Sequence, residues 1–321
     1  MAISGRVIRG RIKSVKNTKK ITKAMELVSA AKMRRAVAAA LQSRTYARYA
    51  WELLTRLEAT GRALEKSEHP LLAVRPVKKI LVVAITSNRG LAGAFNSNVI
   101  KLVAQQIRHP EQIARNRVGK RWIEPANDHP EMEFVIVGKR GETALRRITD
   151  KIVASFVDVP DVPKLSDVTA LITLAIGGYE RGEYDKVVLA YTDFVSALVQ
   201  KPKVRQLLPI STVDIEKTLF PEGVVADPVG HEEWSEVFVE FEPSITEIIG
   251  AAVTRLIESQ VYQAVLESSA SEHSARMMSM RQATDAATDM IDTLTLVFNQ
   301  ARQASITKEI SEISAGKAAL E

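Results

Sequence analysis

The sequence predicts an α/β domain joined to a long antiparallel α-helical coiled coil formed by the N- and C-terminal helices. Three observations support this fold class. No proline occurs from Met1 to His69 or after Pro243, so both ends of the chain can form uninterrupted helices. Short apolar runs typical of buried strands occupy the middle of the 321-residue chain. The two ends also differ in the sign of their charge, which favours their pairing.

The N-terminal helix, expected over residues 1–60, carries most of the positive charge. Residues 1–56 hold 14 Lys/Arg against 2 Asp/Glu, a surplus of +12, whereas the whole chain has a formal charge of +6. Apolar side chains spaced mainly three and four residues apart form one narrow stripe, which we expect to face a partner helix. The stripe comprises Ile8, Ile12, Val15, Ile21, Met25 and Val28, with Thr18 and Thr22 filling gaps.

The C-terminal helix, expected over residues 244–321, is mildly acidic, with 6 Lys/Arg against 10 Asp/Glu. At 1.5 Å per residue the two helices would be roughly 80 Å and more than about 100 Å long, too long to be buried in a globule. Packing them against each other is the economical arrangement. A similar apolar spacing marks Ala283, Ala287, Ile291, Leu294, Phe298, Ala301 and Ala304.

The middle of the chain, residues 77–240, predicts a Rossmann-like α/β domain. Three strand-like runs, KKILVVAITS, EFVIVG and DKVVLAYTDF, alternate with helical stretches at 95–108, 141–148 and 166–181. Such alternation is typical of β-α-β units in a parallel sheet. We expect VRQLLPI and EVFVEF to add edge strands.

Two segments interrupt this alternation. Residues 109–131 are polar and contain three prolines, so we interpret them as a surface insertion. Residues 221–233 are expected to form another loop.

Residue types that carry chemistry are absent or scattered. The chain has no cysteine, which excludes disulfides and thiolate metal sites and is typical of a reducing compartment. Its five histidines form no i, i+4 ligand pair, and His273 is interpreted as a partly exposed position between helices. Asp158 and Asp161 flank Pro160 in an ordinary turn pattern. We therefore expect no catalytic residues, no metal site and no cofactor.

The most enzyme-like feature is TSNRGLAGAFNSN, residues 86–98. A strand that enters a glycine-containing turn and then a helix can bind phosphate on helix N-terminal N–H groups. The stretch lacks the third glycine of a dinucleotide fingerprint and the Gly-Lys-Ser/Thr of a Walker loop. A tight structural turn is the favoured interpretation, and a small nucleotide-binding enzyme remains an alternative. Titration of the purified chain with nucleotide would test it.

The second alternative is a basic coiled-coil protein that binds nucleic acid. Lys and Arg side chains neutralise phosphates whatever the base sequence. In the N-terminal helix, however, the charges point in most directions, and almost no aromatic residues lie among them for base stacking. An acidic protein cavity around the helix explains the charge equally well. Steeply salt-dependent binding of nucleic acid would favour this alternative.

Three separated blocks give the whole chain a specific resemblance. They are RIKSVKNTKKITKAMELVSAAKMRRA at 11–36, TSNRGLAGAFNSNV at 86–99, and ESSASEHSARMMSMRQATDAATDMI with LTLVFNQARQASITKEISEI within 267–313. Together, and in this order, they resemble the gamma subunit of F-type ATP synthase.

The resemblance implies a rotor. The terminal helices would form a shaft inside a hexamer of alternating alpha and beta subunits, with the α/β domain at the base. The shaft would couple rotation of the membrane ring to conformational changes in the catalytic beta subunits and have no active site of its own. Expected partners are the alpha, beta and epsilon subunits and the c-ring, with no nucleic acid. The location that the resemblance implies is peripheral, at the cytoplasmic face of a bacterial plasma membrane. No stretch approaches 18 consecutive apolar residues, so membrane association is expected only through the complex.

Carried over by position, the resemblance marks six expected partner contacts. Lys23 and Met25 match a coupling contact toward an acidic loop of a beta subunit, and Arg276 matches a residue of the same coupling. Three polar positions match groups that hydrogen-bond loops of the surrounding subunits: Arg302, Gln303 and Thr307. In the same segment we expect packing from Ala301, Ala304, Ile306, Ile310 and Ile313.

The chain departs from the family pattern in three places. Gly316 and Lys317 stand where Gly-Ala is expected, which adds a charge near the tip of the shaft. The insertion at 109–131 is longer than expected. No disulfide-forming pair like that of the plant chloroplast form is present, so thiol regulation is excluded. The basic N-terminus resembles a transit peptide, but its helical pattern continues past residue 50, so we expect a bacterial chain without a cleaved leader.

Overall fold

The computed structural model describes residues 5–59, 69–118, 121–126, 129–210 and 245–318. The chain divides into two compact units. The first contains the start of the N-terminal helix, through Ala31, and the end of the C-terminal helix, from Arg276. The second extends from Lys32 to Ala275 and contains the sheet.

The chain contains two very long helices, as the sequence predicts. Helix α1 covers Gly5–Ala59, 55 residues, and α7 covers Ile245–Ala318, 74 residues. At 1.5 Å per residue they are about 80 and 110 Å long. Neither contains a proline, the residue that would remove a helical hydrogen bond and clash with the preceding turn. The fold class is confirmed.

The second unit is built on a five-stranded sheet with the order β5-β4-β1-β6-β7. Strands β1 (Lys79–Ile85), β4 (Glu131–Val137), β5 (Ile152–Phe156) and β6 (Lys186–Phe194) pair in parallel, whereas β7 (Gln200–Leu208) pairs antiparallel with β6 at one edge. The predicted strands at KKILVVAITS, EFVIVG, DKVVLAYTDF and VRQLLPI are all present. EVFVEF and the loop at 221–233 lie outside the described residues.

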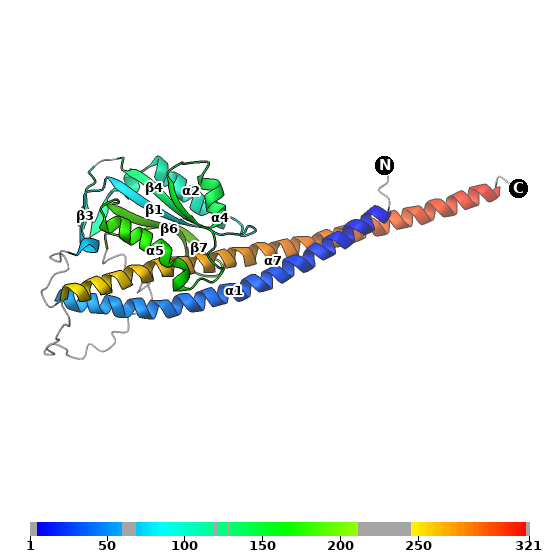
Figure 1. The fold of residues 1–321 in the computed structure, drawn as a ribbon. Helices are drawn as coiled ribbons and strands as arrows, with labels where there is room; N and C mark the ends of the chain where they lie inside the picture. The colour runs from blue at the N-terminus through cyan, green and yellow to red at the C-terminus, as the bar shows by residue number, and fades with distance from the viewer. Residues whose placement is uncertain (1–4, 60–68, 119–120, 127–128, 211–244, 319–321) are drawn as a thin grey trace. The chain divides into compact units, whose positions relative to one another are not determined.

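Helices cover both faces of this sheet (Figure 1), which gives the open α/β architecture. One core contains side chains of α5 (Leu165–Glu180), the short helix η2 (Pro70–Leu72) and the first half of α7. The other contains side chains of α2 (Phe95–Arg108), α3 (Glu111–Ala114) and α4 (Lys139–Leu145). Strand β1 is buried on both faces, as its continuous apolar run predicts.

The insertion has structure of its own. Besides α3, it forms a small antiparallel pair, β2 (Asn116–Val118) with β3 (Arg121–Ile123). Ile113 and Ala114 are buried, and Ile113 packs in the core that contains side chains of α2 and α4, whereas Trp122 is 60% exposed. The segment is therefore partly anchored in the core rather than lying wholly on the surface.

The glycine-containing turn after β1 is filled by the chain's own side chains. The Asn96 side-chain oxygen accepts from the Ser87 N–H at 3.0 Å. A Cβ on Gly90 would lie 2.8 Å from the Arg140 guanidinium, and one on Gly138, at φ 94°, would lie 2.4 Å from the Thr86 carbonyl oxygen. The positive φ and the close approach of the Thr86 carbonyl require glycine at 138, whereas the Arg140 side chain beside Gly90 is flexible and could move. The favoured interpretation, a tight structural turn, fits this geometry.

The first half of α7 is buried although it is rich in polar residues. Serine hydroxyls bind carbonyl groups of the domain: Ser271 donates to Thr192 at 3.2 Å and Ser274 donates to Ala197 at 2.6 Å. Tyr191 donates to the Glu267 carboxylate at 3.2 Å, deep in the core. Because buried polar groups need such partners, the bonds fix the rotation and position of α7 against the sheet. His273, expected to be partly exposed, is 1% exposed in this segment.

Candidate functional site

In the first unit the two long helices pair through a seam that is polar at its centre. On α1 the more buried positions advance by alternating steps of four and three residues, the heptad pattern of a coiled coil. They are Ile8, Ile12, Val15, Lys19, Thr22, Glu26 and Ser29. On α7 the expected positions from Ala283 to Ala301 are buried or half-buried, whereas Ala304 is exposed.

The predicted apolar stripe on α1 is therefore partly wrong. Ile21 and Val28 are 60% and 54% exposed, and Thr18 is exposed as well. The heptad that begins at Ile8 brings Thr22 and Ser29 to the seam without a break. Moving the neighbouring apolar residues inward would have required a change of register. Continuity of the repeat thus prevails over hydrophobicity at these two positions.

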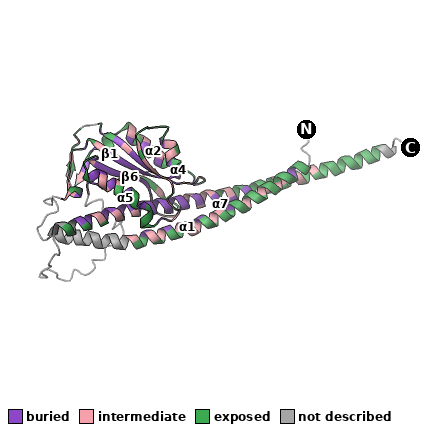
Figure 2. Ribbon diagram, in the orientation of Figure 1, coloured by how far each residue is buried: buried purple, intermediate pink, exposed green. Residues whose placement is uncertain are grey.

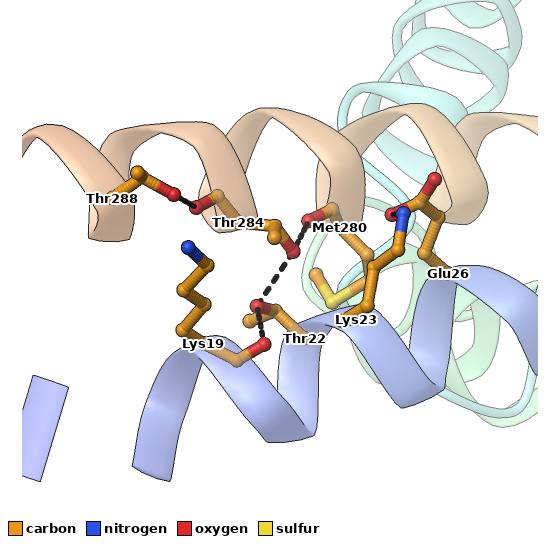
Figure 3. A network of polar contacts seen from close by, with 7 residues as sticks. All are labelled: Lys19, Thr22, Lys23, Glu26, Met280, Thr284 and Thr288. Atoms are coloured by element: carbon orange, nitrogen blue, oxygen red, sulfur yellow. Dashed lines mark hydrogen bonds and ion pairs between the residues drawn. The ribbon is translucent and has the colours of Figure 1, made fainter. Parts of the chain in front are cut away.

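A network of hydroxyl groups joins the helices at the centre of the seam (Figure 3). The Thr22 and Thr284 Oγ1 atoms are 2.8 Å apart, and both side chains are buried. Thr22 also lies 3.1 Å from the Lys19 carbonyl oxygen, and Thr284 lies 2.8 Å from that of Met280. The two hydroxyls have only two protons for these three contacts. Either Thr284 donates to Thr22, which donates to the Lys19 carbonyl oxygen, or Thr22 donates to Thr284, which donates to the Met280 carbonyl oxygen. Such a buried polar pair specifies which residues lie opposite each other.

Lys23 and Met25 lie beside this network on α1. The Lys23 ammonium forms an ion pair with the Glu26 carboxylate at 3.0 Å (Figure 3), and the Lys23 side chain is 53% exposed. Met25 is half-buried. Lys23 therefore presents a positive charge to the exterior from a position that Glu26 restrains.

Arg276 is a buried residue of α7, 6% exposed. Because Thr22 faces Thr284 in an antiparallel pair, Arg276 lies level with about Ala30 of α1. The structure thus brings Arg276, Met25 and Lys23 within about two helical turns of one another along the shaft.

Arg302, Gln303 and Thr307 lie elsewhere, at the far end of α7. All three are exposed. The same antiparallel register places Gly5, the first residue of α1, level with about Ala301, so these three residues lie on α7 beyond the start of α1 (Figure 1). Arg302 is about 28 Å from the level of Lys23 along the helix axis, at 1.5 Å per residue. Lys317 lies in the last turns of α7.

The expected packing role of the apolar residues near this end is wrong for the chain itself. Ile306, Ile310 and Ile313 are 48%, 59% and 73% exposed. Ala304 is exposed too, and it lies beyond the level of Gly5, the first described residue of α1. Figure 2 shows the change along α7, from a largely buried first half to an exposed end.

The shaft is polar at the centre of its seam, and its exterior carries exposed apolar side chains among the charged and polar ones. Leu27 on α1 is 60% exposed and Leu296 on α7 is 61% exposed, alongside the isoleucines named above. Large exposed apolar patches on a soluble chain mark surfaces that partner proteins cover. Sequence reasoning missed this surface because it assigned nearly every apolar residue to the seam, and a strict heptad count from Ile8 would have identified it.

These features define a protein that combines an α/β domain with a helical shaft, and the outer surface of the shaft is suited to enclosure by partner proteins. The family model described as "ATP synthase" matches residues 4–320. The ATP synthase gamma chain of Herpetosiphon aurantiacus is 40% identical over 99% of both chains, and that of Pelotomaculum thermopropionicum is 42% identical over 98% of this chain and 99% of its own. The chain belongs to the ATP synthase gamma-chain family.

Solved structures share the fold. A rotor chain of the Euglena gracilis mitochondrial ATP synthase is 19% identical, with a TM-score of 0.56 over 94% of this chain and 98% of its own. A central stalk/c-ring chain of the Tetrahymena thermophila enzyme is 24% identical, with a TM-score of 0.55 over 82% of this chain and 99% of its own.

The function that the resemblance implies is confirmed: the chain is a central rotor shaft subunit of ATP synthase. It works within the multi-subunit complex as a component peripheral to the membrane. Within the described ranges no helix combines the length and apolar character needed to cross a bilayer.

Proposed function

We propose that the shaft turns inside a ring of alternating alpha and beta subunits and passes rotation to their catalytic sites by making different contacts with each beta subunit. A rotating element shifts conformational populations only if it interacts with the states to different extents. An exterior that is part apolar, part basic and part neutral polar provides such unequal contacts. The single observation that supports this proposal is the exposed apolar surface around a polar seam.

Within this proposal the six marked residues form two contact regions. Lys23, Met25 and Arg276 would act near the middle of the shaft, where Lys23 faces an acidic loop of a beta subunit. Arg302, Gln303 and Thr307 would engage loops around the end of the shaft. The exposed polar side chains there, together with nearby isoleucines, suit an enclosing surface that is partly apolar and partly hydrogen-bonding.

The proposed organisation assigns residues 1–60 and 244–321 to the shaft and residues 77–240, with the insertion at 109–131, to the base. The base would contact the epsilon subunit and the c-ring. We place the complex at the cytoplasmic face of a bacterial plasma membrane, with membrane association made through the ring.

Affinity purification tests the proposed partners. Tagged full-length chain should recover a complex that contains three copies each of two larger subunits, which quantitative mass spectrometry would count. Recovery of the chain alone, or with nucleic acid instead of these subunits, would contradict the proposal.

The variant Met25→Lys tests the coupling contact. A new positive charge at this half-buried position should disturb the contact with the beta subunit, so ATP-driven ion pumping should fall more than ATP hydrolysis in reconstituted vesicles. Val153→Lys, which adds the same charge at a 49% exposed position of β5, is the matched control and should leave both activities unchanged. Equal pumping per ATP in Met25→Lys and the unmodified complex would remove Met25 from the proposal.

A further inference from the structure

We propose that the loop between β5 and α5 is a brace that fixes both long helices to the α/β domain, with Asp161 as its central positioning residue. The inference rests on the proposed rotor function and adds to it the path by which torque passes between base and shaft. The loop, VDVPDVPK at residues 157–164, contains two prolines. Each proline fixes one backbone angle, so the loop is stiffer than its length suggests.

The backbone of the brace is bound to α7. The Ser269 hydroxyl donates to the carbonyl oxygen of Asp161, and His273 Nε2 lies 3.2 Å from the same oxygen. About two turns before Ser269 on α7, the Tyr262 hydroxyl donates to the Pro163 carbonyl oxygen at 3.2 Å. Ser269 and His273 are 8% and 1% exposed. Because these bonds use main-chain oxygens, they do not depend on the Asp161 side chain.

The side chain of the brace is bound to α1. The Lys32 ammonium donates to the Asp161 carboxylate in an ion pair, and their side chains are 25% and 29% exposed. This partial burial shields the pair more than an ordinary surface salt bridge. Burial raises the pKa of Asp161, but the hydrogen bond and charge of Lys32 outweigh it, so the pKa lies below the ordinary value.

One residue therefore holds two helices through different groups. The main-chain oxygen of Asp161 contacts α7 and its carboxylate contacts α1. Helix α7 has additional hydroxyl bonds to the domain through Ser271 and Ser274. Direct attachment of both helices to the domain lets each receive torque from the base without relying on the helix–helix seam alone. The brace supplies a direct hold on α1.

The test separates the two attachments in the assembled complex. Asp161→Asn removes the carboxylate charge and keeps the main-chain bonds to α7, and Lys32→Met removes the ammonium while keeping its length. In reconstituted vesicles each variant should reduce the ions pumped per ATP hydrolysed by about twofold or more. The charge exchange Lys32→Asp with Asp161→Lys should restore the ratio. The control is Lys151→Gln, which breaks the exposed ion pair in which Lys151 Nζ lies 2.9 Å from the Glu131 carboxylate. This pair involves neither long helix, so the ratio should be unchanged.

The outcome decides between the brace and a purely structural role. A structural role would lower assembly or hydrolysis and pumping together, without changing their ratio. Single variants that pump normally per ATP, or a charge exchange that fails to restore a lowered ratio, would overturn the proposal. The wild-type complex must first assemble and pump, and failure at that stage would refute the proposed function rather than the brace.

A covalent link provides a second test if the charge variants assemble poorly. The chain contains no cysteine, so Lys32→Cys with Asp161→Cys can be joined selectively by a short bifunctional thiol reagent. The joined complex should pump at the wild-type ratio, and the same double variant without the reagent should pump at a lower one. Equal ratios with and without the link would overturn the proposal.

Discussion

Thr22 and Thr284 place hydroxyl groups at seam positions where coiled coils usually pack branched apolar side chains. A threonine pair contributes less burial energy than a pair of leucines, but it favours one register because a slip separates the two hydroxyls and leaves each with only the carbonyl of its own helix. In a shaft, fixed register matters because it keeps the exterior residues at constant relative heights. Lys23, Met25 and Arg276 stay near one another through this alignment.

A double-mutant cycle measures this contact. Thr22→Val should lower the free energy of unfolding by about 1 kcal/mol, because the Thr284 hydroxyl loses a buried partner. Thr22→Val with Thr284→Val should cost less than the sum of the single changes, with a coupling of about 0.5–1 kcal/mol. Urea unfolding of the full chain gives these values.

The exposed Thr18→Val is the control for this cycle. It removes only a bond to the Ser14 carbonyl oxygen one turn away on the same helix, so it should change stability little. Additive effects of Thr22→Val and Thr284→Val would show that the hydroxyl contact does not contribute to stability.

Local sequence gives no indication of the role of Asp161. Two aspartates beside a proline form a common turn pattern, and the partner Lys32 lies 129 residues away. The six expected contact residues on the shaft could be proposed in advance because the motifs around them resemble those of one family, and their contacts stay a prediction. Their positions relative to one another required the register that Thr22 and Thr284 set.

At the scale of elements, runs of apolar residues made the strands β1, β4 and β6 predictable. Strand β5 was not predicted because its sequence has no such run. Strand β5 is only partly buried at the sheet edge, and its sequence, IVASF, contains two small residues. The interior of α7 was equally hard to read. Its serines give no apolar signal, yet Ser271 and Ser274 are buried and donate to carbonyl groups of the domain at positions that only the folded sheet provides.

The loop that follows β5 should make stability depend on pH. The pKa of Asp161 is lower in the folded chain than its ordinary value near 3.8, so the ion pair contributes stability above about pH 4. This contribution should be lost as pH falls below 4 through the folded pKa. The urea midpoint of the wild-type chain should therefore fall more steeply between about pH 5 and pH 3 than that of Asp161→Asn. Parallel curves would show that the Asp161 carboxylate is not stabilised by Lys32 in solution.

At the scale of the whole molecule, the exposed end of α7 makes the chain depend on its partners. Ile306, Ile310 and Ile313 are not needed for the fold of the isolated chain, because nothing in the described part of the chain covers them. Their apolar area becomes useful only in an assembly. The same sequence thus encodes an α/β domain with its own buried core and a shaft end whose apolar side chains the described part of the chain leaves exposed.

Replacing the three isoleucines with serine separates these roles. Each change should alter the unfolding free energy of the isolated chain by no more than about 0.5 kcal/mol, as is usual for exposed positions. Recovery of head subunits in affinity purification should fall severalfold. Leu198→Ser, at a 75% exposed apolar position in the turn between β6 and β7, is the matched control and should not affect recovery. Unchanged recovery of the triple variant would show that the end of the shaft does not contribute to assembly.

The pairing of α1 with α7 also determines when the shaft can form. Arg9 lies over the ring of Phe298, 5.2 Å from its centre, although nearly the entire chain separates the two residues. During synthesis the strands from β1 to β7 can pair while α7 has yet to be made, and contacts between distant residues form late because closing a long loop costs entropy. Helix α1 is therefore synthesised before the strands of the domain, but its partner helix α7 is available only after they have been made.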